Sequence, residues 1–213
     1  MHRSCINELL LVNHSDLNLR MRRILIDWLL TVSDSFSYMK ETTHLGVAIL
    51  DLYLSSSQNI SRKTFQCVGL TSLYIASKIT EEIVCTSDDL VYICDNAYSK
   101  KTFLDMEKNI CRSIDYNVML SHSMTNFASL SKNISKDNIS KILYYLDCIL
   151  FEPSILYKYD IDDLIESSIE IVCQKGDFRS DCMEKILQLE EDIKKNNSKQ
   201  FEDFKKKYAS FIE

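Results

Sequence analysis

With 213 residues, of which 46% are apolar and 26% charged, the chain has the composition of a folded globular protein with one or two domains. It contains only three glycines, none of them close to another, and one proline; this excludes a many-stranded fold, whose turns need these residues, as well as a glycine-rich phosphate loop, and predicts an all-α chain. The formal charge of −6 is spread as 0 over residues 1–20, −2 over 21–118 and −4 over 119–213, which excludes the clustered positive charge of a nucleic-acid-binding protein, so we expect no nucleic-acid partner.

The first half of the chain predicts a short helix followed by five more. A short apolar run predicts the first over about 4–12. From Met21 to Phe36 apolar residues recur on one face of a helix, and Asp16 or Asn18 is placed to cap it. The other four are expected over about 42–57, over 61–79, from the start signal at 86–89 to about 94, and over 100–114. In the helix expected over 61–79, the central residues are apolar or small on nearly every side, which predicts the most buried, central helix of a bundle.

The second half repeats this plan with another five helices. They are expected over about 123–131, 137–150, 160–175, 181–195 and 199–212. The only proline, Pro153, follows the second of them, where a helix should stop. The third again mixes apolar and small residues in its middle, which predicts a second buried central helix. We therefore expect two groups of about five helices, with a hinge near 116–120.

No motif for catalysis or for metal binding stands out. The eight cysteines include no pair at C-x-x-C spacing and no histidine at a zinc-ligand interval, so neither a metal site nor a cofactor is expected. Most cysteines lie in apolar helical runs, which indicates a reduced intracellular protein without a disulfide framework. The longest apolar run near the N-terminus, Leu9–Val12, is too short for a signal peptide or a membrane span. We expect no membrane partner and no enzyme, because nothing pairs the four scattered histidines with a nucleophile.

Four segments carry a recognisable pattern. They are MRRILIDWL at 21–29, ASKITE at 76–81, VYICDNAYSKK at 91–101 and ME at 106–107. In the same order, they resemble the MRxxLxDWL, ASKxxE, VYITDNAYTKK and ME motifs of the cyclin family, and specifically of A/B-type cell-cycle cyclins. The resemblance is strong over 21–118. It is weaker but traceable over 119–213, where 146–159 and Lys207-Tyr208 resemble the second cyclin box.

The resemblance implies two tandem five-helix cyclin folds. An N-terminal helix and loop would occupy 1–20, the N-terminal cyclin box 21–118, and the C-terminal cyclin fold, with a C-terminal helix, 119–213. A protein of this kind has no catalytic activity of its own. It binds a cyclin-dependent protein kinase, activates it by holding the mobile regulatory helix of the kinase in place, and so controls the cell cycle. Such a regulator is expected in the nucleus and the cytoplasm.

By the family motifs, two polar residues, Lys78 and Glu107, would anchor the kinase. Lysine offers three donors to carbonyls at a helix end, and glutamate can accept hydrogen bonds from exposed amides. From these residues alone, a surface Lys and Glu paired with each other is the simpler interpretation. The resemblance adds apolar kinase contacts at Ile79, Cys111 and Val118, with Ile79 in place of an aromatic residue that is common in the family.

The resemblance also implies a groove on the first long helix, which takes Arg-x-Leu-type docking segments of substrates or inhibitors. Its members would be Met21, Ile24, Leu25 and Trp28, together with Arg62, Gln66 and Ile93. Apolar residues at helical spacing are more typical of a core, and only a partly exposed strip would indicate docking. Thr31 stands where the family usually has a glutamate that faces the arginine, unless another acid, such as Asp34, fills that role.

A structural ion pair is implied between Arg22 and Asp51, which match a pair in the family. It would tie the first long helix to the second and would serve the fold rather than a partner. Such a pair stabilises weakly overall, yet the loss of one partner costs about 3–5 kcal/mol when the pair is buried.

Two related classes remain as alternatives: a transcription-type cyclin and a cyclin-fold transcription initiation factor. An initiation factor of this fold binds DNA and should be basic, whereas both halves of the chain are acidic. Transcription-type cyclins lack the close match to VYICDNAYSKK. Kinase binding measured against DNA binding would separate the cyclin classes from the initiation factor.

Overall fold

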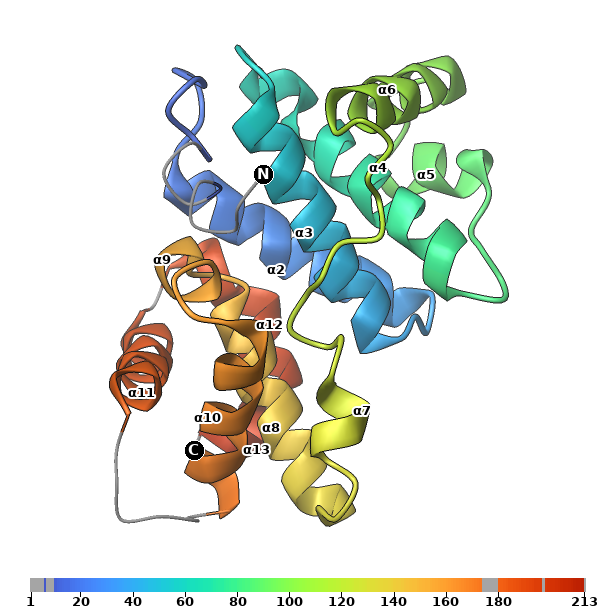
Figure 1. Cartoon of the computed structure of the whole chain (residues 1–213). Helices are drawn as coiled ribbons and strands as arrows, with labels where there is room; N and C mark the ends of the chain where they lie inside the picture. Colours follow the sequence, from blue (N-terminus) through green and yellow to red (C-terminus); the bar gives the residue numbers. More distant parts are fainter. Residues whose placement is uncertain (1–5, 7–9, 174–179, 197, 213) are drawn as a thin grey trace.

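A computed structural model describes residues 6, 10–173, 180–196 and 198–212 (Figure 1). Its first half contains helices α2 (Leu19–Ser35), α3 (Lys40–Ser56), α4 (Arg62–Thr80), α5 (Ser87–Ile93) and α6 (Lys100–Ser113). Its second half contains α7 (Phe127–Leu130), α8 (Lys136–Ile149), α9 (Pro153–Leu156), α10 (Ile161–Cys173), α11 (Asp181–Lys195), the 3-10 helix η1 (Lys199–Phe201), α12 (Glu202–Lys207) and α13 (Ala209–Ile212). No strand occurs within these ranges, and the prediction of an all-α fold is confirmed. The helix expected over 4–12 falls largely outside the described residues.

The helices form two groups, α2–α6 and α7–α13 (Figure 1). In the first group α3 packs along α4, and in the second group α8 packs against α10 and α11. The connection between α6 and α7 runs along the side of both groups without forming regular helix. The hinge expected near 116–120 falls in this connection.

Capping side chains explain where several helices begin. The Asn18 side chain accepts a hydrogen bond of 3.0 Å from a backbone N–H in the first turn of α2, so Asn18 and not Asp16 caps this helix. Thr86 and Asp89 form a reciprocal capping box at the start of α5. Ser99 caps α6 in the same way as Asn18 caps α2. These signals are local in the sequence, and the helix starts follow from them.

The most buried of the long helices is α3 rather than α4. Thirteen of the seventeen residues of α3 are buried, against eleven of nineteen in α4. The prediction that the helix over 61–79 is the most buried was wrong, because it rested on apolar and small residues alone. Helix α3 also buries polar residues, such as His44 and Asp51, against the second group. Gly46 allows α3 to approach α4 closely, since a Cβ atom there would lie only 3.1 Å from the Cα of Leu73.

The second group departs from the predicted helices in three places. Helix α7 covers only 127–130 of the expected 123–131. Helix α10 buries only four of its thirteen residues, so the prediction of a second helix buried on all sides was wrong. Pro153 does follow α8, but it also opens the separate short helix α9, whose first turn tolerates a residue without an N–H donor.

The C-terminal segment, expected as a single helix over 199–212, is divided into η1, α12 and α13. The division has a physical reason in α2. The carboxylate of Asp27 accepts hydrogen bonds from the backbone N–H groups of Asp203 (3.1 Å) and Phe204 (2.7 Å). Inside a continuous helix these N–H groups would bond to carbonyls four residues earlier, so they are available to Asp27 because a new helix starts here.

Two buried polar networks join the groups, and the first contains the expected ion pair. Arg22 donates to both carboxylate oxygens of Asp51 (2.8 and 2.6 Å) and to the carbonyl of Leu150 (2.9 Å). The Tyr157 hydroxyl also donates to Asp51 (2.6 Å). Burial works against the charged form of Arg22, but Asp51 outweighs it and raises the pKa of Arg22. The pair therefore ties α2 and α3 not only to each other but also to the second group.

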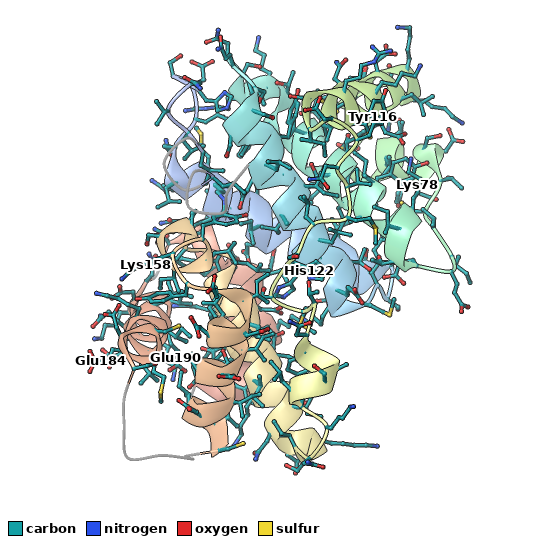
Figure 2. All side chains as sticks on the ribbon, in the orientation of Figure 1. Lys78, Tyr116, His122, Lys158, Glu184 and Glu190 are labelled. Atoms are coloured by element: carbon teal, nitrogen blue, oxygen red, sulfur yellow. The ribbon has the colours of Figure 1, made fainter. Side chains whose placement is uncertain are left out.

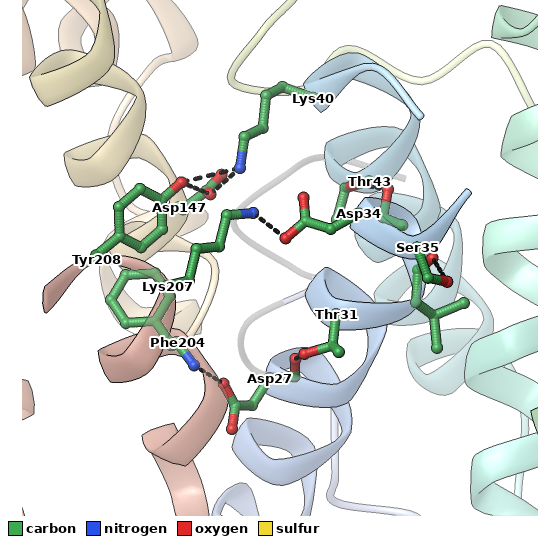
Figure 3. A network of polar contacts seen from close by, with 12 residues as sticks. Asp27, Thr31, Asp34, Ser35, Lys40, Thr43, Asp147, Phe204, Lys207 and Tyr208 are labelled. Atoms are coloured by element: carbon green, nitrogen blue, oxygen red, sulfur yellow. Dashed lines mark hydrogen bonds and ion pairs between the residues drawn. The ribbon is translucent and has the colours of Figure 1, made fainter. Parts of the chain in front are cut away.

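The second network lies around Asp147 of α8 (Figure 3). Lys40 and Tyr208 donate to one of its carboxylate oxygens, and His44 Nε2 lies 3.0 Å from the other. Burial disfavours the ionised form of Asp147, but Lys40 and His44 outweigh it and hold the pKa of Asp147 below its usual value. The carboxylate stays ionised between α3, α8 and the C-terminal segment.

Candidate functional site

Lys78, at the end of α4, meets Glu107 of α6 at the surface. The Nζ atom of Lys78 forms an ion pair with a carboxylate oxygen of Glu107. The same ammonium lies 4.3 Å from the centre of the Tyr74 ring, in cation–π range. Both side chains are about one quarter to one third exposed, and Figure 2 shows Lys78 at the outer edge of the first group. The pairing agrees with the simpler interpretation of the sequence, and it also holds both charges in place at the surface.

The apolar residues of the expected kinase surface flank this pair. Ile79 and Cys111 are half-buried. Ile79 directly follows Lys78, and Cys111 lies one helical turn after Glu107. Burial raises the pKa of the Cys111 thiol, and the charge of Glu107 raises it further while Lys78 opposes both effects. The Cys111 thiol is thus neutral at pH 7 and acts as a small apolar group. Val118 is half-buried in the connection after α6.

Two exposed apolar side chains in the connection after α6 were missed from the sequence. Tyr116 is 68% exposed and Met119 75% exposed. The backbone N–H of Tyr116 donates to the carbonyl of Cys111 (2.7 Å), which fixes Tyr116 beside the end of α6 (Figure 2). Asp115 and Tyr116 both have left-handed φ values, 52° and 56°, which stop the helix. The sequence contains no signal for this turn, since neither residue is a glycine.

The expected groove is a pocket of about 430 Å³ between α2, α4 and the C-terminal segment. Six of the seven predicted residues line it, namely Met21, Ile24, Leu25, Trp28, Arg62 and Gln66. Ile24 is 40% exposed, whereas Met21 and Trp28 are half-buried and Leu25 is buried. The strip is therefore partly exposed, as docking requires. Ile93 does not line the pocket, because at the end of α5 it packs against the core.

Neither of the residues considered for the acidic end of the groove lines the pocket. Thr31 is exposed, and its hydroxyl donates to the carbonyl of Asp27 (3.2 Å). Asp34 forms an ion pair with Lys207 (Figure 3). The structure instead brings three residues of the C-terminal segment to the pocket wall, Lys199, Glu202 and Asp203. Sequence reasoning missed them because their neighbours in α2 are more than 170 residues away along the chain.

The remaining chemistry of the described residues is sparse. Among them, no group of three or more His, Cys, Asp or Glu side chains could hold a metal ion. None of the helices that the structure describes is long and apolar enough to cross a membrane. Seven cysteines within the described ranges have free thiols, and Cys5 lies outside those ranges.

Comparison with known proteins shows the family to which this chain belongs. The model of the cyclin N-terminal domain matches residues 2–119. The chain therefore belongs to the cyclin family. Its resemblance to A/B-type cyclins is confirmed by its similarity to Cyclin-B2-4 of Arabidopsis thaliana, with 41% identity over 118 residues that cover 55% of this chain and 27% of that protein. G2/mitotic-specific cyclin-B of Hydra viridissima is 35% identical over 144 residues, 66% of this chain and 36% of that protein.

The X-ray structure of a viral cyclin from herpesvirus saimiri has the same fold. It superposes with a TM-score of 0.70 and 20% identity, covering 85% of this chain and 81% of the viral chain. The curated relatives named above are longer, and the chain spans about a quarter to a third of their length. The fold and the family are thus shown for this chain.

Proposed function

We propose that the chain is a regulatory subunit that binds and activates a cyclin-dependent protein kinase and so controls the cell cycle, in the nucleus and the cytoplasm. The observation that carries this proposal is the Lys78–Glu107 ion pair, held at the surface between the half-buried Ile79 and Cys111. Charges flanked by apolar groups suit an interface whose centre is apolar and whose polar anchors are few. The similarity to B-type and G2/mitotic-specific cyclins favours this class over a transcription-type cyclin or an initiation factor.

The arrangement supports activation by selection of one kinase conformation. Phosphoryl transfer requires the glutamate of the mobile kinase helix to pair with the ATP-positioning lysine. A cyclin surface that contacts this helix only in the active arrangement shifts the kinase toward that arrangement. Because Lys78 and Glu107 already hold each other, little side-chain entropy is lost when the kinase binds. Catalysis stays with the kinase.

The same chain recruits substrates or inhibitors through the pocket on α2. A partly exposed apolar strip normally marks a partner site. An extended segment of the Arg-x-Leu type, with one apolar anchor, fits a pocket of about 430 Å³ whose floor contains Met21, Ile24 and Trp28. The pocket lies at the start of α4 and the kinase anchors lie at its end, so recruitment and activation use different parts of the chain.

The test of kinase binding is the double variant Lys78→Ala with Glu107→Ala. Each residue contributes hydrogen bonds to charged groups, which are worth about 1.5–3 kcal/mol apiece. Because the two residues also bond to each other, we expect a joint loss nearer to 2 kcal/mol, about thirtyfold in Kd. Binding to a panel of recombinant cyclin-dependent kinases is measured by calorimetry, together with kinase activity.

A matched control is Lys101→Ala with Asp105→Ala, which removes another ion pair from α6. That pair is more exposed, with 85% and 49% of its side chains accessible. The control should bind each kinase as the unmodified chain does. Undiminished kinase binding by the folded Lys78/Glu107 variant would refute the proposed role of this pair.

A further inference from the structure

We propose that Glu202 and Asp203 of α12 bind the basic residue of a segment docked in the pocket on α2, so that the second helical group determines docking specificity. The inference rests on the proposed docking function. The occupant is an extended peptide that carries one cationic side chain and, close to it, one large apolar side chain.

The pocket has walls of opposite chemistry. Helix α2 provides the apolar floor, and the first turn of α4 provides one wall with Arg62 and Gln66. The opposite wall is built from η1, which brings Lys199 to the pocket, and from α12, which brings Glu202 and Asp203. A peptide whose apolar side chain lies on the floor is therefore repelled by Arg62 when its cation points to α4. The same cation is attracted when it points to α12.

The acidic wall is held firmly against α2. The Asp27 carboxylate accepts hydrogen bonds from the N–H groups of Asp203 and Phe204, and Figure 3 shows Asp27 pointing from α2 to α12. Asp27 is 4% exposed and Phe204 1% exposed. The backbone that carries Glu202 and Asp203 is thus fixed relative to the apolar floor. A site placed in this way loses little entropy when a ligand binds.

The two carboxylates are accessible to an incoming cation. The side chains of Glu202 and Asp203 are 52% and 47% exposed. Their ion partner within the chain is Lys206, at 3.1 and 3.3 Å, and the Lys206 side chain is 67% exposed. An exposed pair of this kind is worth little, so a guanidinium that is already anchored through its apolar neighbour can replace the lysine.

On the α2 side, one acid lines the pocket, Asp27. Asp27 is buried, and both of its carboxylate oxygens accept backbone N–H groups. Thr31 is uncharged, and Asp34 is paired with Lys207. The position of Thr31, at which the family resemblance implied a glutamate, is therefore neutral here. The acidic charge reaches the pocket from α12.

The test uses three fluorescein-labelled peptides and the complete chain. The first peptide contains Arg-x-Leu, the second has Gln in place of Arg, and the third has Ala in place of Leu. Anisotropy gives Kd for each. With the unmodified chain, we expect the Arg-to-Gln change to weaken binding about threefold to fivefold, the effect of a partly exposed ion pair. The Leu-to-Ala change should weaken binding further, because it removes the apolar anchor.

The decisive variant is Glu202→Gln with Asp203→Asn. It should bind the Arg peptide as weakly as the Gln peptide, while the Kd of the Gln peptide stays unchanged. The matched control is Glu191→Gln with Asp105→Asn, which removes two carboxylates that also pair with a lysine four residues away. This control should keep the full preference for arginine. If the double variant does not fold, the single variants Glu202→Gln and Asp203→Asn provide the same comparison.

An arginine preference that survives loss of both carboxylates overturns the inference. So does an unmodified chain that binds the Arg and Gln peptides equally well while still requiring leucine, and in that case docking itself stands. If none of the three peptides binds, or if the Leu-to-Ala change has no effect, the proposed docking function fails and the inference fails with it.

Discussion

Arg22→Met is the change that should reveal most about how the two helical groups depend on each other. Arg22 is fully buried and donates to Asp51 and to the carbonyl of Leu150. Methionine fills a similar volume but carries neither the charge nor the donors. The carboxylate of Asp51 then remains buried without its counter-charge, and the Leu150 carbonyl loses its Arg22 donor. The Asp51 carboxylate and the Leu150 carbonyl then stay removed from water without the bonds from Arg22 that compensate for the lost hydration.

The expected loss is large for a single substitution. Breaking a buried pair by removing one partner costs about 3–5 kcal/mol. For a chain of this size each kcal/mol lowers Tm by about 2–4 °C, so we expect a decrease of roughly 10 °C. Arg23→Met is the control, since Arg23 is the neighbouring residue and its pair with Glu152 is partly exposed, with 24% and 18% of the two side chains accessible. It should cost clearly less than Arg22→Met, because both charges left by the change keep contact with water.

A double-mutant cycle separates the pair from its surroundings. Urea unfolding followed by circular dichroism gives the free energy of unfolding for Arg22→Met, Asp51→Leu and the double variant. The double variant should lose clearly less than the sum of the single losses, because no buried charge is left unpaired. Additive losses, or an Arg22→Met variant within 1 kcal/mol of the unmodified chain, would refute the assignment of this pair as a buried link.

Two further predictions concern stability. Burial raises the pKa of Asp27 to about 6, although hydrogen bonds from the N–H groups of Asp203 and Phe204 oppose the increase. The folded chain therefore binds this proton more tightly than the unfolded chain does. As a result, the contribution of Asp27 to stability falls as pH rises from about 4 to about 6. The unfolding free energy of the unmodified chain minus that of Asp27→Asn should thus decrease between pH 4.5 and 6.5 in urea titrations, and a constant difference would contradict the raised pKa. Gly46→Ala would place a Cβ 3.1 Å from the Cα of Leu73 and push α3 away from α4. The overpacking should cost about 1–3 kcal/mol, more than the gain of about 1 kcal/mol in helix propensity, so the urea midpoint of unfolding should fall. A higher midpoint would show that the two helices can separate freely.

The helices were predictable where their signals are local. The apolar period from Met21 to Phe36 and the capping residues Asn18 and Ser99 act within a few positions of the chain, and the structure uses all of them. Similarly, six of the seven residues that the family resemblance implied for the groove line the pocket. In both cases short segments of sequence determine the outcome.

The failures concern contacts between distant segments. Burial of α3 depends on polar partners of His44 and Asp51 that lie more than 100 residues further on. The break between η1 and α12 depends on Asp27, and the acidic wall of the pocket depends on that break. Periodicity indicates which face of a helix is apolar. It does not indicate which other helix covers the polar residues, so these features required the structure.

The position of both surfaces on α4 makes their functions independent in electrostatic terms. Arg62 opens α4 beside the pocket, and Lys78 lies near its other end beside Glu107. At 1.5 Å per residue these two positions are about 24 Å apart. The Debye length at physiological salt is about 8 Å, so charges at this separation are almost completely screened from each other. Removing Glu202 and Asp203 should therefore change peptide docking without changing kinase affinity, and any coupling between the two would have to pass through movement of α4 itself.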